Sequence, residues 1–308
     1  MLIFLASAKT ALAVTIASDS FTVGAGYTAG LLTPQSGSPS AVNFTGNWGG
    51  SQTGYYQVVS SSLSLSGYAG TGGSLLVQTR DDGTFSRNSS HTFTADTTSS
   101  STLWFSSLYQ PSTGAFENNN EAMMGFTSGS PPLTADGTTL GASWTSSNGA
   151  GLAGFAWGIN TGTNNSNTLK IKYQSDFGGS AGVVLADTGV ALTIGTTYFL
   201  IGKIALNAAG NQDTLNVWIR TSLPTNETSL GAANWSISTA NLLNSSSNLN
   251  TLLLFGGAGT QEGATVDWRS TYYDSVRIGT TFADIVPEPS RFLLLGFAFL
   301  GLFYKRRR

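Results

Sequence analysis

Short segments in which apolar and polar residues alternate one by one recur along the chain. In residues 169–174, LKIKYQ, the apolar side chains fall on one face and the polar side chains on the other. Residues 214–220 repeat this pattern, with Leu215, Val217 and Ile219 on one face. A period of two is typical of a half-buried antiparallel strand, so each segment is predicted to be a strand with one face in a core.

Further strand-like segments lie between turn pairs such as Asp-Gly and Asn-Gly. They cover residues 55–59, 62–66, 74–80, 102–109, 154–159, 196–206, 251–255 and 271–278. Ten or more short strands without intervening helices predict an all-β fold, an antiparallel β-sandwich of the jelly-roll kind over residues 14–285. Residues 203–220 are expected to form a hairpin whose loop covers residues 207–212.

The composition excludes several classes of function. The 308 residues include no Cys and a single His, His91, so disulfide scaffolds, thiol nucleophiles and multi-His metal sites are excluded. Six of the 14 basic residues lie before residue 14 or after residue 289, which leaves eight against 16 acidic residues between those positions, a net charge of −8 there. A nucleic-acid partner needs a basic face, so none is expected.

The N-terminus has the pattern of an export signal. Residues 2–8 are apolar, and Ala11-Leu12-Ala13 fits a small-x-small cleavage site. We interpret residues 1–13 as part of a secretory signal peptide that begins upstream, because its basic region is missing, with Val14 as the first mature residue. The alternative is an N-terminal apolar strand of the fold.

The C-terminus has three consecutive parts. Val286, Pro287, Glu288 and Pro289 precede an apolar run at 292–304, and Lys305, Arg306, Arg307 and Arg308 end the chain. The 13 apolar residues form a helix of about 20 Å, short of the roughly 30 Å hydrocarbon core, and flanking cations supply part of the difference. The basic cluster should stay cytoplasmic, which places the preceding residues outside. We therefore predict a short transmembrane helix.

This tail resembles the PEP-CTERM sorting signal of Gram-negative bacteria. The resemblance implies that residues 286–289 are recognised by exosortase, a membrane protease that removes the helix and the basic tail. It also implies export across the inner membrane, transient anchoring there, and a final place at the cell surface or in the matrix of bacteria that make exopolysaccharide and biofilm.

The middle of the chain resembles LamG-like, concanavalin-type jelly-roll domains. The resemblance is carried by DSF at 19–21, GNW at 46–48, the hairpin GNQDTL at 210–215 and the closing YDSVRIGTTFAD at 273–284. The closing strand of that family usually begins Asp-Glu, so Ser275 departs from it. The resemblance implies a sandwich over most of residues 19–285.

Paired carboxylates decide whether such a sandwich is expected to be an enzyme. Glycoside hydrolases on concanavalin-type folds need two carboxylates about 5 Å apart, usually at alternate positions of one strand. No Glu-x-Asp spacing occurs among the 16 acidic residues, and His91 has no Gly-x-Ser-x-Gly elbow to form a triad with. We expect a non-catalytic protein that is structural or glycan-associated, and a glycoside hydrolase is the alternative.

Two kinds of binding site remain open. Asp81, Asp82 and Asp213 lie in or beside turns and are candidate ligands of a structural calcium ion, although such residues more commonly form plain turns without an ion. No other cofactor is expected.

Trp218 is the candidate platform for a polysaccharide. If Leu215, Val217 and Ile219 face the core, Trp218 points the other way together with Asn216 and Arg220. An aromatic ring between an amide and a guanidinium suits the apolar face of a sugar. The alternative is that another segment covers this face and Trp218 only packs.

Overall fold

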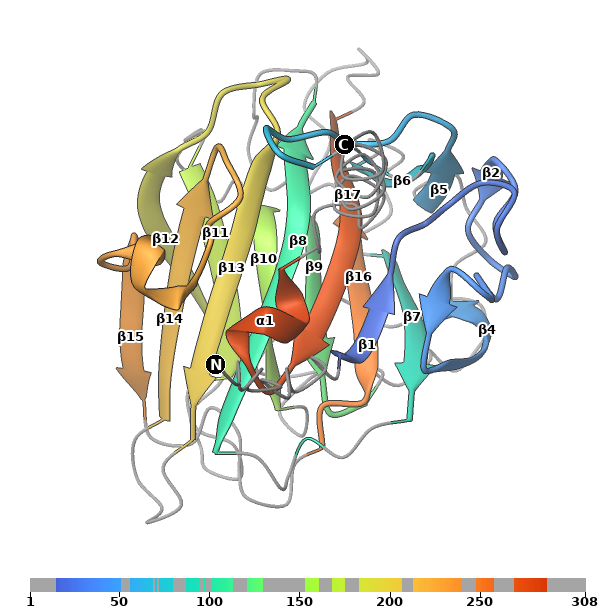
Figure 1. Ribbon diagram of the computed structural model, residues 1–308. Helices are drawn as coiled ribbons and strands as arrows, with labels where there is room; N and C mark the ends of the chain where they lie inside the picture. The colour runs from blue at the N-terminus through green and yellow to red at the C-terminus, as the bar shows by residue number, and fades with distance from the viewer. Residues whose placement is uncertain are drawn as a thin grey trace, which may run out of the picture.

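The computed structural model describes a set of ranges that covers most of the sandwich. These are residues 15–50, 56–68, 70, 72–79, 87–94, 97, 101–112, 121–129, 153–160, 168–174, 183–206, 213–239, 248–257 and 269–286. In this part of the chain a ten-stranded sheet and a seven-stranded sheet lie one behind the other (Figure 1). The predicted all-β antiparallel sandwich is therefore confirmed.

The ten-stranded sheet contains both ends of the described sandwich. Its order is β15 (Trp235–Thr239), β14 (Asp213–Arg220), β13 (Tyr198–Ala205), β8 (Thr102–Pro111), β17 (Arg269–Gly279), β6 (Ser74–Thr79), β5 (Tyr56–Val59) and β2 (Gly30–Leu31). In addition, β1 (Thr15–Asp19) pairs with β17, and β3 (Ala41–Val42) pairs with β1.

The seven-stranded sheet forms the other layer. Its order is β12 (Val183–Ala191), β11 (Thr168–Gln174), β10 (Gly154–Asn160), β9 (Glu121–Thr127), β16 (Thr251–Gly257), β7 (Arg87–Phe93) and β4 (Phe44–Gly50). Every pairing between these strands is antiparallel.

Aromatic side chains fill the space between the two sheets. The Phe105 ring of β8 lies 4.2 Å, centroid to centroid, from the Phe155 ring of β10. The Trp157 Nε1–H donates to the Ser107 hydroxyl across the layers at 3.1 Å. The Tyr273 hydroxyl lies 3.2 Å from the backbone carbonyl of Ala122 in the facing sheet. These two hydrogen bonds pair buried polar groups of one sheet with groups of the other, as burial in an apolar interior favours.

The predicted strand phases agree with the packing. Leu215, Val217 and Ile219 lie in the core between the sheets, and β13 pairs with β14 as the predicted hairpin. Its loop at 207–212 lies outside the described residues. Leu169, Ile171 and Tyr173 of β11 also face this core.

The polar face of β11 is more enclosed than a half-buried strand requires. Lys170 and Lys172 are each only 7% exposed. The Lys170 ammonium donates to the Asp187 carboxylate on the neighbouring strand β12. The Lys172 ammonium lies 5.5 Å from the centre of the Phe255 ring. Their charges are therefore compensated by a carboxylate and by an aromatic face.

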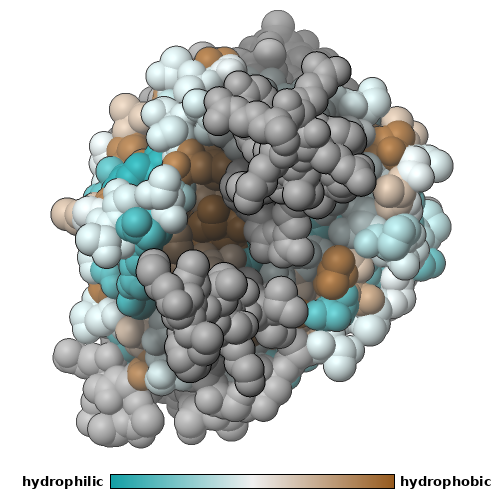
Figure 2. Space-filling view, in the orientation of Figure 1, coloured by the Kyte–Doolittle hydropathy of each residue, from teal (hydrophilic) through white to brown (hydrophobic). Residues whose placement is uncertain are grey.

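A second apolar cluster, called the outer cluster below, lies on the other face of the ten-stranded sheet. Its buried members are Leu63, Trp104, Leu108, Phe199, Ile201, Trp218, Leu230 and Ile285. Two short helical turns, η1 (Glu227–Leu230) and α1 (Phe282–Ile285), contribute Leu230 and Ile285, and α1 lies in front of the sheet in Figure 1. Figure 2 shows a hollow with a hydrophobic floor on this face.

Burial on both faces explains strand β8. Seven consecutive residues of β8, from Leu103 to Tyr109, are buried, because alternate side chains enter the core and the outer cluster. A strand that is covered on both sides loses the simple alternation that marks a half-buried one.

The predicted membrane anchor cannot be compared with the structure. Among the described residues no helix has the length and apolarity needed to span a bilayer. The predicted signal peptide at 1–13 and the predicted transmembrane run at 292–304 both lie outside the described residues.

Candidate functional site

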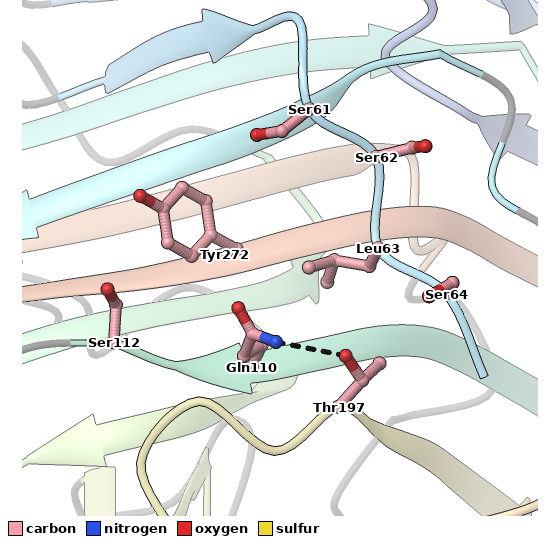
Figure 3. A pocket seen from close by; sticks show the side chains of 8 residues that line it. All are labelled: Ser61, Ser62, Leu63, Ser64, Gln110, Ser112, Thr197 and Tyr272. Atoms are coloured by element: carbon pink, nitrogen blue, oxygen red, sulfur yellow. Dashed lines mark hydrogen bonds between the residues drawn. The ribbon is translucent and has the colours of Figure 1, made fainter.

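A groove of about 370 Å³ opens on the outer face of the ten-stranded sheet, beside the outer cluster. Figure 3 shows the side chains that line it, which come from four parts of the chain. They are Ser61, Ser62, Leu63, Ser64, Gln110, Ser112, Thr197 and Tyr272. None of these eight side chains carries a charge, and five of them are serine or threonine.

The sheet register brings the floor of the groove together. Gln110 of β8 and Tyr272 of β17 are directly paired residues, so their side chains project from the same face. Ser112 follows the end of β8, and its backbone N–H donates to the Ser270 carbonyl of β17 at 2.8 Å. Thr197 immediately precedes β13, which pairs with β8 on the other side. Three neighbouring strands therefore present these polar groups in one row.

Gln110 is held in a fixed orientation. Its Nε2 donates to the Gly195 carbonyl at 2.9 Å and to the Thr197 hydroxyl oxygen at 3.0 Å, the second of which is drawn in Figure 3. Both amide hydrogens are thus used, and the amide oxygen remains as an acceptor in the groove. Among the described residues, the hydroxyls of Ser62, Ser64 and Tyr272 have no hydrogen-bond partner, so they are also available to a ligand.

Residues 61–64, called the serine wall below, follow β5 in the sequence and precede β6. They form the opposite side of the groove. The Ser61 carbonyl accepts from the Ser74 hydroxyl of β6 at 2.6 Å. The Leu63 N–H donates to Oδ2 of Asp274 at 3.2 Å, and the Leu63 side chain is a buried member of the outer cluster. Bonds to β6 and β17 and the packing of Leu63 in the outer cluster therefore hold the wall in place.

Asp274 is itself buried and has no exposed surface. Its Oδ1 accepts from the Ser275 hydroxyl at 3.1 Å. Because the Ser275 hydroxyl donates there, it accepts from the Tyr68 hydroxyl, which lies 2.7 Å away. Burial raises the pKa of Asp274 to about 7, although the hydrogen bonds to its carboxylate oppose that rise.

Asp19 is a second buried carboxylate. Its Oδ2 accepts from the Tyr27 hydroxyl at 2.5 Å and its Oδ1 from the Phe21 N–H at 2.9 Å, while the Trp48 Nε1–H donates to the Tyr27 hydroxyl. Burial raises the pKa of Asp19 to about 7 as well. Both values suit a general acid, but Asp19 and Asp274 are 0% exposed and cannot reach a substrate.

Trp218 is not the exposed platform that the sequence predicted. Its predicted strand phase is confirmed, since it lies on the face opposite Leu215 and Val217. The prediction that it reaches solvent is wrong, because only 8% of it is exposed. Its ring stacks on Trp104 with centroids 6.0 Å apart, and its Nε1–H donates to the Gly231 carbonyl at 3.1 Å. The segment that contains η1 covers this face.

The two predicted neighbours of Trp218 make local structural contacts. The Asn216 side-chain oxygen accepts from the Ser236 hydroxyl at 2.6 Å. The Arg220 guanidinium donates to the Asn234 side-chain oxygen at 2.5 Å and to the Leu230 carbonyl. Arg220 therefore holds the end of η1 and the loop after it against β14, and it does not lie beside an exposed ring.

Of the three predicted calcium ligands, the structure describes one, Asp213. Asp213 is the first residue of β14 and is 4% exposed, whereas Asp81 and Asp82 lie outside the described residues. Within the described ranges, no group of three or more His, Asp or Glu side chains is placed to hold a metal ion. The calcium site stays a prediction.

The predicted sorting motif at 286–289 overlaps the described residues only at Val286. Val286 packs against the outer cluster and is the last described residue. Pro287, Glu288 and Pro289 lie outside the described residues, as does the basic tail of Lys305, Arg306, Arg307 and Arg308.

His91 is a core residue. It is 1% exposed, its Nε2–H donates to the Gly46 carbonyl at 3.2 Å, and its ring lies between Phe44 and Trp48. Burial lowers the pKa of His91 to about 4. His91 is closed off by these aromatic rings and cannot reach a substrate, so it is not placed to act as the base of a triad.

Sequence reasoning missed the groove. Gln110, Ser112 and Tyr272 are ordinary polar residues at or near the ends of strands, and no motif marks them. One signal was present: Tyr272 and Tyr273 are adjacent in a strand, so one ring must point away from the core.

Comparison with known proteins adds distant likenesses. No family model and no curated protein matches the chain. Among solved structures, the carbohydrate esterase of Shiga toxin-encoding bacteriophage phi24B is 14% identical, with a TM-score of 0.41 over 85% of this chain and 98% of that one. Lectin II from Ulex europaeus is 11% identical, with a TM-score of 0.38 over 78% and 94%. The exoplasmic/lumenal domain of VIP36 is 11% identical, with a TM-score of 0.39 over 79% and 86%. At such TM-scores these likenesses assign neither a ligand nor an activity.

Proposed function

We propose that this protein is an exported, non-catalytic component of the extracellular polymer layer whose β-sandwich binds a neutral polysaccharide in the groove. The observation that carries the proposal is the lining itself. Hydroxyl and amide groups surround one aromatic ring, Tyr272, and no lining side chain is charged. Such a lining matches a sugar, which presents hydroxyls at its edge and C–H groups on its face.

The open form of the groove supports a polymer as the ligand. The serine wall and the row from Gln110 to Thr197 flank it (Figure 3), and the groove is partly open to solvent. A site with one aromatic ring gives weak binding per copy, since stacking of a ring contributes about 1–3 kcal/mol by analogy with stacking on nucleic-acid bases. Many repeats along a polymer then provide the avidity that a single site lacks.

Two observations favour binding over hydrolysis. Glycoside hydrolysis needs a pair of carboxylates on either side of the bond that breaks. The described residues that line the groove include no carboxylate, and Asp274, which bonds to the serine wall from beneath, has no exposed surface. Hydrogen bonding and stacking are the chemistry that the lining offers.

The proposal also covers the route to the cell surface. Residues 286–289 with the apolar run and the basic tail would be processed by exosortase after export across the inner membrane of a Gram-negative bacterium. The sandwich, of the concanavalin or LamG-like jelly-roll kind, would then remain at the cell surface or in the matrix.

Affinity electrophoresis tests the binding part. The protein is run through gels that contain hydroxyethylcellulose, galactomannan or dextran, which are neutral, or alginate, which is acidic. We expect retardation by at least one neutral polymer and none by alginate. Ser64→Arg fills the groove and should abolish the retardation, whereas Ser66→Arg adds the same side chain two residues away, outside the lining. Equal migration in all gels, or equal loss in both variants, would reject the proposed site.

A further inference from the structure

The closing strand β17 is interrupted by an irregularity directly beneath the groove. Its register with β8 shifts between Asp274 and Arg277. Ser275, inside this bulge, has a φ of 51°, a left-handed conformation that is unfavourable for a residue with a side chain. Bulges re-aim side chains and are frequent next to functional sites, and local strain persists only where the surroundings hold it.

The bulge directs Asp274 at the serine wall. Its two carboxylate oxygens accept from the Leu63 N–H and from the Ser275 hydroxyl, and Ser275 connects to Tyr68. Leu65 and Tyr68 exchange two backbone hydrogen bonds, of 3.0 and 2.8 Å, so the chain after the wall turns back in a tight hairpin. One buried carboxylate therefore ties both ends of this segment to β17.

The charged and titratable groups around Asp274 come from three elements. Asp19 of β1 is a like charge and raises the pKa of Asp274 further. Tyr68 lies in the segment after the wall, and burial raises the pKa of its hydroxyl. The positive charge of Arg277 on β17 lowers that pKa. Burial is the largest influence on Asp274 itself.

We propose that Asp274 is a positioning residue for the groove: its ionised carboxylate holds the serine wall opposite Gln110 and Tyr272, and protonation weakens saccharide binding. This inference rests on the proposed function and adds a pH dependence to it. A hydrogen bond to a charged acceptor is about twice as strong as one to a neutral acceptor, so the Leu63 N–H is held more firmly by the carboxylate than by the carboxylic acid.

The direction of the effect follows from linkage. If the ligand prefers the ionised form, affinity rises with pH through the pKa of Asp274, which burial places at about 7. Binding should therefore be weakest in mild acid and reach a plateau above neutral pH.

The test measures affinity at about pH 5.5 and about pH 8.5, on either side of the expected transition, with the neutral polymer that retards the wild-type protein most. The wild type should bind about fivefold or more tightly at the higher pH, the lower end of typical coupling between two sites. Asp274→Asn should bind with an affinity that no longer changes with pH. Thermal unfolding at both pH values establishes that each protein is folded.

Asp19→Asn is the matched control. Asp19 is equally buried and its pKa is equally raised, but its partners are Tyr27 and Phe21 and not the serine wall. Removal of its negative charge should leave the pH dependence of binding in place and move its midpoint to lower pH, because Asp19 raises the pKa of Asp274. A purely structural Asp274 would show no such shift.

The possible results separate the two proposals. Wild-type binding that is equal at both pH values overturns the role of Asp274 and leaves the groove as the site. Absence of binding to any neutral polymer at either pH overturns the proposed function. If Asp274→Asn does not fold, the wild-type profile and the shifted midpoint of Asp19→Asn still decide the matter.

Discussion

The outer face of the ten-stranded sheet has two halves that differ in how they are covered. In one half, Trp104 and Trp218 stack beneath η1 and α1 and are almost fully buried. In the other half, the serine wall, Ser112 and Thr197 are the described residues that line the groove around Gln110 and Tyr272. The same strands, β8 and its neighbours, contribute to both halves.

The comparison shows that the outward phase of a strand does not make a residue available to a ligand. Trp218 and Tyr272 both point away from the core between the sheets. Side chains from residues 223–233 cover Trp218, and Phe282 of α1 covers Trp104 beside it. Nothing comparable among the described residues covers Tyr272. The first is therefore expected to serve stability and the second to serve binding.

The largest effect is expected from Trp218→Ala. Loss of a buried, stacked indole and of its hydrogen bond to Gly231 should lower the free energy of unfolding by about 3–5 kcal/mol. Urea denaturation followed by tryptophan fluorescence measures this change. Retention on the polysaccharide should be unchanged once the folded fraction is taken into account. An unchanged midpoint together with lost retention would mean that the covered half is the binding half.

Tyr272→Ala should show the opposite pattern. Loss of a stacking ring is worth about 1–3 kcal/mol of binding, so affinity should fall roughly tenfold, while the stability loss stays below that of Trp218→Ala. Titration with the neutral polymer measures the change in affinity. Tyr272→Phe keeps the ring and should retain most of the affinity. If both variants lose affinity equally, the hydroxyl and not the ring makes the contact.

Asp19→Asn tests how the free energy of unfolding depends on pH, at a residue that belongs neither to the covered half nor to the groove. Burial raises the pKa of Asp19 to about 7, so the folded protein keeps a proton that the unfolded chain releases near pH 4. The stability that Asp19 contributes is fully present below about pH 4, the pKa in the unfolded chain, and is lost as the pH rises to about 7. Asp19→Asn should reduce the slope of unfolding free energy against pH in this range, and Asp274, whose pKa burial also raises to about 7, should account for the slope that remains. A fall of equal slope in the variant would assign the dependence to Asp274.

The smallest effect is expected from Ser112→Ala. Its hydroxyl is at the edge of the groove, and one neutral hydrogen bond contributes about 0.5–1.5 kcal/mol, so affinity should fall about threefold. Stability should change by less than about 0.5 kcal/mol, as for most surface substitutions. Titration and denaturation of the same sample measure both. If the free energy of unfolding falls more than the free energy of binding, Ser112 serves packing, like the residues of the covered half, and not binding.

The sequence by itself determined the fold class and the strand phases. The alternation at 169–174 and 214–220 requires one face of each strand to enter a core, and Leu169, Ile171, Leu215 and Val217 do so. This works because a period of two follows from backbone geometry, which is local.

Only the tertiary structure decided which outward-facing residues meet solvent. Trp218 is covered by a segment that follows it in sequence, and Trp104, on which it stacks, is covered by Phe282 of α1, far along the chain. The groove joins Ser61–Ser64 to Gln110, Thr197 and Tyr272 through the pairing of β8 with β13 and β17. Long-range pairing and the placement of covering segments depend on the packing of the whole sandwich, and no local pattern of residues encodes them.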